Sequence, residues 1–152
     1  MKLTLNKNEI CEYQQNREPY LMIDYATEVI PGQSAEGFKN LKEDEWFFKV
    51  HWPNDPNMPG MLQLEALTQM CALSILTLPD NKGKIMYLAS ANNIKFFRKV
   101  TPGKKFLIKT KINSFKRGIA ICEGAGFISD EVIACKAEFN LVLPNLLTKI
   151  KF

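Results

Sequence analysis

The sequence contains a single histidine, His51, among 152 residues, and its four cysteines include no Cys-x-x-Cys pair. Histidines and closely spaced cysteines are the side chains from which zinc sites are built, so we expect no metal site. The cysteines are scattered, and three of them lie in apolar or strand-like runs. This pattern favours buried, reduced thiols of a cytoplasmic protein over disulfides. The four residues are Cys11, Cys71, Cys122 and Cys135.

The chain also lacks a long uninterrupted apolar run. The longest apolar stretch, residues 61–78, is interrupted by polar residues that include Gln63, Glu65, Thr68 and Gln69, so we interpret it as a buried core helix and expect no membrane span. The first eight residues lack the apolar segment and cleavage site of a signal peptide, which again favours a cytoplasmic location. Because no internal repeat or linker is present, we expect one domain over residues 1–152, with its core at about 14–142.

The net charge is only +4, but the basic residues are concentrated between positions 95 and 117. One interpretation is a solvated strand face, since Lys105, Lys109 and Lys111 share one side at a period of two. The other is a docking surface for an acidic partner. No aromatic-rich basic strand or recognition helix accompanies the charge, so we do not expect a nucleic-acid partner. The docking candidates are Lys95, Arg98, Lys99, Lys116 and Arg117.

The order of predicted elements indicates an α+β fold. A short helix is predicted over residues 6–15, with Asn6 or Asn8 as its cap, followed by a hairpin of residues 20–30 and 33–41. A long helix is predicted from about Pro59-Gly60 to Thr77, and four strands follow Gly83. Because apolar residues cover most of the long helix, other structure must surround it. A curved antiparallel sheet wrapped around one long central helix meets that requirement.

The residues around His51 suggest acid–base chemistry. Imidazole can accept a proton near neutral pH, and Glu65 is a carboxyl group on an otherwise apolar helix, where burial is costly unless the group is used. Gly60 lies at the expected start of that helix, where N–H groups are unpaired. Considered alone, His51 and Glu65 would each be better interpreted as an ordinary polar residue. Together they suggest a base, an acid and an oxyanion site.

The run His51-x-Pro-x-x-Pro-x-x-Pro-Gly60-x-Leu-x-x-Glu65-Ala resembles the signature of the FabZ-type 3-hydroxyacyl-acyl-carrier-protein dehydratases. The segments Arg17–Asp24, Tyr87-Leu-Ala, Phe96–Arg98 and Val100–Gly103 also resemble that family. The resemblance covers about residues 14–142 and implies the hot-dog fold. It also implies a cofactor-free hydro-lyase that removes water from a 3-hydroxyacyl thioester on an acyl carrier protein, in fatty-acid or related biosynthesis.

By this resemblance, His51 is the base that removes the C2 proton, and the Gly60 N–H faces the thioester oxygen. Glu65 either donates a proton to the departing hydroxyl or orients the water. The resemblance further implies a homodimer in which His51 and Glu65 meet across the interface. Whether three such dimers assemble into a trimer of dimers is left open. Met58, Met61 and Trp52 are candidates for an acyl tunnel, because methionine adapts to flexible chains and Trp52 lies beside the base.

The chain departs from the family pattern at Val50, where glycine is usual, and at Trp52, where phenylalanine is usual. These departures leave the chain length of the substrate and the identity of the carrier open. Two alternative functions are a hot-dog thioesterase and a non-catalytic acyl-binding paralogue. The retained His51 and Glu65 favour elimination over both. The tail, residues 145–152, has two open interpretations, an oligomer contact or disorder.

Overall fold

The computed structural model describes residues 1–144, so the predicted roles of the tail lie outside the described residues. Seven antiparallel strands form one sheet in the order β1-β2-β3-β5-β6-β7-β4. The strands are β1 (Leu3–Leu5), β2 (Tyr25–Ile30), β3 (Ser34–Asn40), β4 (Tyr87–Phe96), β5 (Lys105–Lys116), β6 (Ile119–Ser129) and β7 (Val132–Val142). The helices are α1 (Lys7–Tyr13), α2 (Trp46–Val50) and α3 (Gly60–Leu76).

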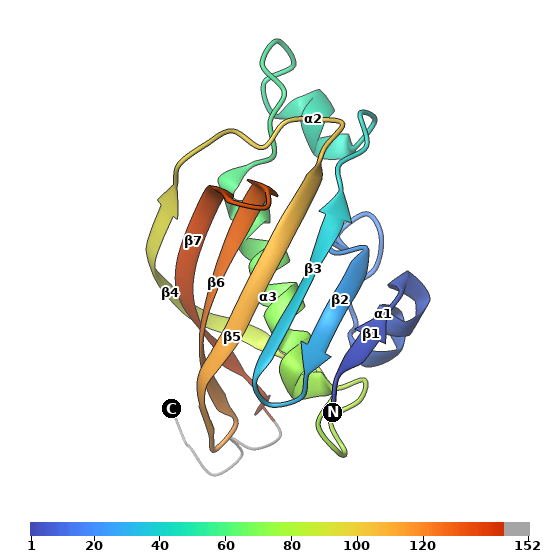
Figure 1. Ribbon diagram of the computed structural model, residues 1–152, viewed down its shortest axis with the longest axis vertical. Coiled ribbons are helices and arrows are strands. Elements are labelled where there is room, and N and C mark those ends of the chain that lie inside the picture. Colours follow the sequence, from blue (N-terminus) through green and yellow to red (C-terminus); the bar gives the residue numbers. More distant parts are fainter. Residues whose placement is uncertain (145–152) are drawn as a thin grey trace.

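Helix α3 lies against one face of the curved sheet (Figure 1). Fourteen of its seventeen residues are buried, and it contacts strands β2, β3, β5, β6 and β7. Its apolar surface is therefore covered by the sheet, as the sequence predicted. The close approach needs a small residue on the facing strand. A Cβ built on Gly37 of β3 would lie 2.8 Å from the Met70 methyl group of α3 and 2.0 Å from the Tyr25 carbonyl oxygen, so only glycine fits there.

The α+β architecture of a curved antiparallel sheet around a central helix is confirmed. The capping box of Asn6 and Glu9 confirms Asn6 as the cap of α1. In the part of the chain described, no helix is long and apolar enough to cross a membrane, and no cluster of three or more metal-binding side chains is found.

One local prediction was wrong. Residues 20–24 are not strand, because the N–H of the buried Met22 is bonded by the side chain of Gln69 and not by a neighbouring strand. The aromatic run before His51 is the short helix α2, in which Phe47 and Phe48 are buried in the core while Trp46 is 40% exposed. Strand β1 was not predicted at all, since three residues carry too little periodicity to be recognised.

Candidate active site

The backbone fixes the orientation of the His51 ring. His51 ends α2, and its Nδ1 lies 2.9 Å from the carbonyl oxygen of Asn57. A carbonyl oxygen can only accept, so Nδ1 carries the proton and donates it to this bond. The lone pair of the neutral ring is therefore on Nε2, which is left to act as a base. The ring also stacks on the Trp52 indole, with centroids 4.7 Å apart and planes 25° apart.

The loop after His51 is held in an unusual conformation. Trp52 has a φ of +61°, a left-handed backbone that a bulky residue rarely adopts, and its side chain is 60% exposed. The loop is tied to the segment after β4 by an ion pair of Lys99 with Asp55 at 2.6 Å and by the Met58 N–H, which donates to the Val100 carbonyl at 2.7 Å. These contacts hold the loop between the base and α3.

Gly60 is the first residue of α3. The N–H groups of Leu62 and Gln63 both donate to the Pro59 carbonyl, whereas within residues 1–144 the Gly60 N–H has no hydrogen-bond partner. A free N–H at the positive end of a helix dipole can stabilise a developing negative charge. A Cβ at Gly60 would lie 2.7 Å from the Phe96 ring, so any larger residue would require that half-exposed ring to move.

Glu65 is held by a residue that the sequence analysis did not identify. The buried Gln69 amide donates from Nε2 to Glu65 Oε1 at 2.8 Å and to the Tyr20 carbonyl at 2.9 Å. Its Oε1 accepts the Met22 N–H at 2.8 Å. Gln69 lies one turn after Glu65, and this (i, i+4) spacing was the signal available in the sequence. Burial, followed by the charge of Glu65, raises the pKa of the Tyr20 phenol.

The three tunnel candidates lie in different surroundings. Met58 is buried in the core, whereas Met61 is 69% exposed on the first turn of α3. Trp52 stacks on His51. Met61 and Trp52 are therefore open to a ligand or to another subunit, and Met58 is enclosed by its own chain.

The docking candidates divide into two groups. Lys95, Arg98 and Lys99 lie at the end of β4 that leads to Val100 and the His51 loop. Lys116 and Arg117 lie where β5 turns into β6. Lys116 pairs with Ile119, and Ile119 and Tyr87 both pair with Val142, so this turn is level with the opposite end of β4. Eight residues of β4 separate Lys95 from that end, a distance of about 25 Å.

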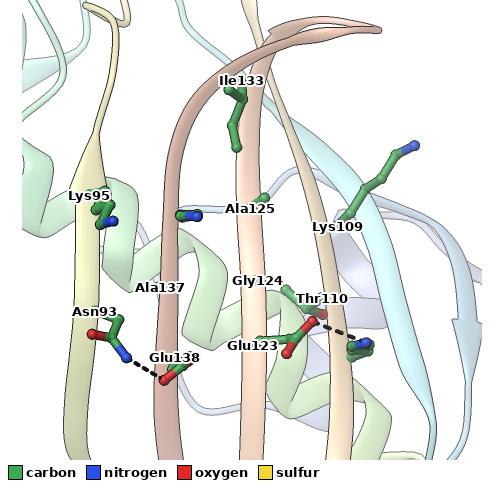
Figure 2. Close-up of a pocket in the computed structure, with 12 residues that line it drawn as sticks. Asn93, Lys95, Lys109, Thr110, Glu123, Gly124, Ala125, Ile133, Ala137 and Glu138 are labelled. Atoms are coloured by element: carbon green, nitrogen blue, oxygen red, sulfur yellow. Dashed lines mark hydrogen bonds and ion pairs between the residues drawn. The ribbon is translucent and has the colours of Figure 1, made fainter.

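A hollow of about 580 Å³ lies on the sheet face away from α3 (Figure 2). Strands β4, β5, β6 and β7 line it, and of the candidate site residues only Lys95 is part of it. Lys95 pairs directly with Lys136, a like-charged arrangement that is unfavourable in a sheet. His51, Gly60 and Glu65 do not line this hollow, so it is distinct from the candidate active site.

Residues 15–137 match the model of the FabA-like domain family. The chain belongs to this family. It is 39% identical over 142 residues to the 3-hydroxyacyl-(acyl-carrier-protein) dehydratase FabZ of Syntrophomonas wolfei, covering 93% of this chain and 98% of that protein. It is 37% identical over 145 residues to the protein of the same name in Alkaliphilus metalliredigens, covering 94% and 98%.

Solved structures agree with the fold of this FabA-like chain. The dehydratase heterocomplex ApeI:P from Xenorhabdus doucetiae has a TM-score of 0.71 at 13% identity, covering 90% of this chain and 91% of that one. A hypothetical thioesterase with coenzyme A from Streptococcus pneumoniae has a TM-score of 0.56 at 12% identity, covering 75% and 80%. At these identities the likeness concerns the fold alone, and it confirms the predicted hot-dog fold.

Proposed function

We propose that this protein is a hydro-lyase that converts 3-hydroxyacyl thioesters on an acyl carrier protein into trans-2-enoyl thioesters. The relatives that carry this name in Syntrophomonas wolfei and Alkaliphilus metalliredigens match almost the whole chain. The observation that carries the proposal is the His51 ring, whose Nδ1 is bound to the Asn57 carbonyl so that Nε2 is free to accept a proton.

In the proposed reaction, Nε2 of His51 removes a proton from C2 while charge collects on the thioester oxygen. The Gly60 N–H stabilises that charge. The bond from C3 to the hydroxyl breaks, the C2–C3 double bond forms, and the hydroxyl leaves as water with a proton from Glu65. Because Gln69 occupies Oε1 of Glu65, the other carboxyl oxygen is the one available to the hydroxyl.

We propose that two subunits build each site. Strand β4 is at the edge of the sheet, and within residues 1–144 it pairs only with β7. Among its residues, Tyr87, Leu88 and Phe96 are apolar and exposed. An exposed apolar edge strand favours association with another strand. Pairing with the β4 of a second copy would form a twofold dimer, in which His51 of one subunit and Glu65 of the other contribute to one site.

The carrier is proposed to dock on the basic group nearest the catalytic loop. Lys95 and Arg98 have no acidic partner within residues 1–144, whereas Lys99 is paired with Asp55. A positive surface would attract an acidic carrier and bring its pantetheine arm to the loop.

The reverse reaction gives a direct assay. A short trans-2-enoyl pantetheine thioester should lose its enoyl absorbance as the purified protein adds water across the double bond. Thiol release without hydration would instead identify a thioesterase and would reject the proposal. Binding without either reaction would identify a non-catalytic acyl-binding protein.

A further inference from the structure

Lys39 is a buried lysine on an inner strand of the sheet. It lies on β3, which pairs with β2 on one side and with β5 on the other, and it is only 2% exposed. A lysine is seldom buried unless opposite charges compensate it. Its ammonium nitrogen, Nζ, is 3.4 Å from Oε1 of Glu45 and 4.0 Å from Oδ2 of Asp24. The lysine charge therefore lies between two carboxyl groups.

The two carboxyl groups depend on Lys39 to different degrees. Asp24 is also 2.8 Å from Nζ of Lys7, and it accepts the Asn40 N–H at 2.7 Å. Glu45 is only 15% exposed, and within residues 1–144 it pairs with no cation except Lys39. Removing the lysine charge would thus leave Asp24 with its other partners, whereas the mostly buried charge of Glu45 would lose its compensation.

Glu45 connects this ion pair to the catalytic loop. It is the N-cap of α2, the five-residue helix that ends at His51. Its carboxyl group makes no capping hydrogen bond and is paired with Lys39 instead. A helix this short is not stable by itself, so its position depends on contacts with the rest of the chain. The Lys39–Glu45 pair is one of those contacts.

The other contacts of α2 involve later residues of the helix. Phe47 and Phe48 are buried in the core, and Nε1 of Trp46 donates to the Pro19 carbonyl at 3.1 Å. The ion pair of Glu45 acts before the first helical residue and joins the start of α2 to β3, which runs towards that helix (Figure 1).

We propose that Lys39 is a positioning residue for His51. Its ion pair with Glu45 fixes the start of α2 on the sheet, and α2 in turn sets where the imidazole lies. This inference rests on the proposed dehydratase function, in which Nε2 of His51 is the base. A misplacement of about 1 Å in a catalytic site can cost a hundredfold in rate. Glu65 is held separately by Gln69, so the effect of Lys39 should fall on the base and not on the acid.

The first test measures the position of His51 without turnover. His51 is the only histidine, so an untagged chain gives a single set of imidazole signals in NMR spectra. In wild type with a neutral ring, the nitrogen shifts should show a proton on Nδ1, because that atom donates to the Asn57 carbonyl. Lys39→Met and Glu45→Gln should both move these signals and populate the second tautomer. The control is Lys111→Met, which loses an exposed ion pair between β5 and β6 and should leave them unchanged.

The second test uses the proposed dimer, in which each site combines His51 of one chain with Glu65 of the other. The reference is a refolded mixture of His51→Ala and Glu65→Gln. In a mixture of Lys39→Met with His51→Ala, every intact His51 comes from the Lys39→Met chain, so activity should be at least about tenfold below the reference. In a mixture of Lys39→Met with Glu65→Gln, the mixed dimer takes His51 from a chain that retains Lys39, so activity should match the reference. A general loss of stability would lower both mixtures alike.

Imidazole signals that stay as in wild type in both variants would overturn the inference, and so would equal activity of the two mixtures. A change in Lys39→Met without one in Glu45→Gln would also overturn it, because the connection through Glu45 would be wrong. If Lys39→Met fails to fold, Glu45→Gln takes its place in both tests. A wild-type protein without hydration activity would reject the proposed function, whereas the NMR comparison would still decide whether Lys39 positions His51.

Discussion

The side-chain amide of Gln69 donates a hydrogen bond to Oε1 of Glu65 at 2.8 Å, across one turn of α3. The same amide binds the backbone at Tyr20 and Met22, so the carboxyl group is connected to the segment before β2. This arrangement fixes where Glu65 points. It makes Gln69 a positioning residue for the proposed reaction, although Gln69 itself is buried.

Gln69→Leu should lower kcat by about ten- to a hundredfold with little change in KM, because a small misplacement of a catalytic group is costly. It should also lower the free energy of unfolding by about 1–3 kcal/mol, since the Met22 N–H loses its partner. Thr68→Val is the control. Its hydroxyl donates to the Glu65 carbonyl and not to the carboxyl group, so this variant should lose stability but keep its kcat. Equal losses of kcat in both variants would show that Gln69 has only a structural role.

Gly60→Ala should separate activity from stability. The added methyl would lie 2.7 Å from the Phe96 ring, but that ring is half exposed and can turn away, so we expect the melting temperature to change little. The loss of kcat/KM should be large, about a hundredfold, because the approach of the thioester to the Gly60 N–H is blocked. If Gly60→Ala retains full hydration activity, this N–H is not the oxyanion site.

Charge reversal should locate the carrier surface. Lys95→Glu and Arg98→Glu should each raise KM for a carrier-linked substrate about tenfold, and the effect should shrink as salt is added. The same variants should turn over a free pantetheine thioester normally. Lys116→Glu, at the other end of the sheet, should have no effect on either substrate. The opposite result, a defect confined to Lys116→Glu, would place the carrier on the turn between β5 and β6.

The free energy of unfolding should fall as the pH rises from about 9 to 11. Burial raises the pKa of the Cys135 thiol from 9.0 to about 11 in the folded chain. Over that interval the unfolded chain has released this proton and the folded chain still holds it, so proton release favours unfolding. The two units of difference correspond to about 3 kcal/mol of stability, which is fully present below pH 9 and is lost as the pH rises through about 11. Denaturant titrations of Cys135→Ala should show a shallower decline, and a decline identical to wild type would contradict this origin.

Much of the fold could be predicted because its patterns are long. The seventeen residues of α3 are apolar on nearly every side, and β5 alternates lysines with buried residues such as Phe106 and Ile108. By contrast, β1 and α2 are three and five residues long, too short for a period to be visible. The segment 20–24 has strand-forming residues, but a tertiary hydrogen bond from Gln69 replaces strand pairing there.

The candidate site was only partly predictable. The spacing of His51, Gly60 and Glu65 is local and visible in the sequence, whereas the tautomer of His51 depends on the carbonyl of Asn57, which any residue at that position would supply. The packing of Phe96 beside Gly60 joins segments far apart in the chain. Likewise, the basic residues between positions 95 and 117 form one stretch in the sequence, but in the structure the length of β4 separates Lys95 from the level of Lys116.

The most direct test mixes two inactive variants. His51→Ala and Glu65→Gln should each lose at least about a hundredfold in enoyl hydration while the oligomer persists. When the two chains are unfolded together and refolded, half of the dimers should be mixed, and each mixed dimer should contain one site with both His51 and Glu65 intact. About a quarter of the wild-type activity should therefore return. If the mixture stays as inactive as its components, or if either variant alone keeps near wild-type activity, the proposed pairing of His51 with the partner subunit's Glu65 is wrong.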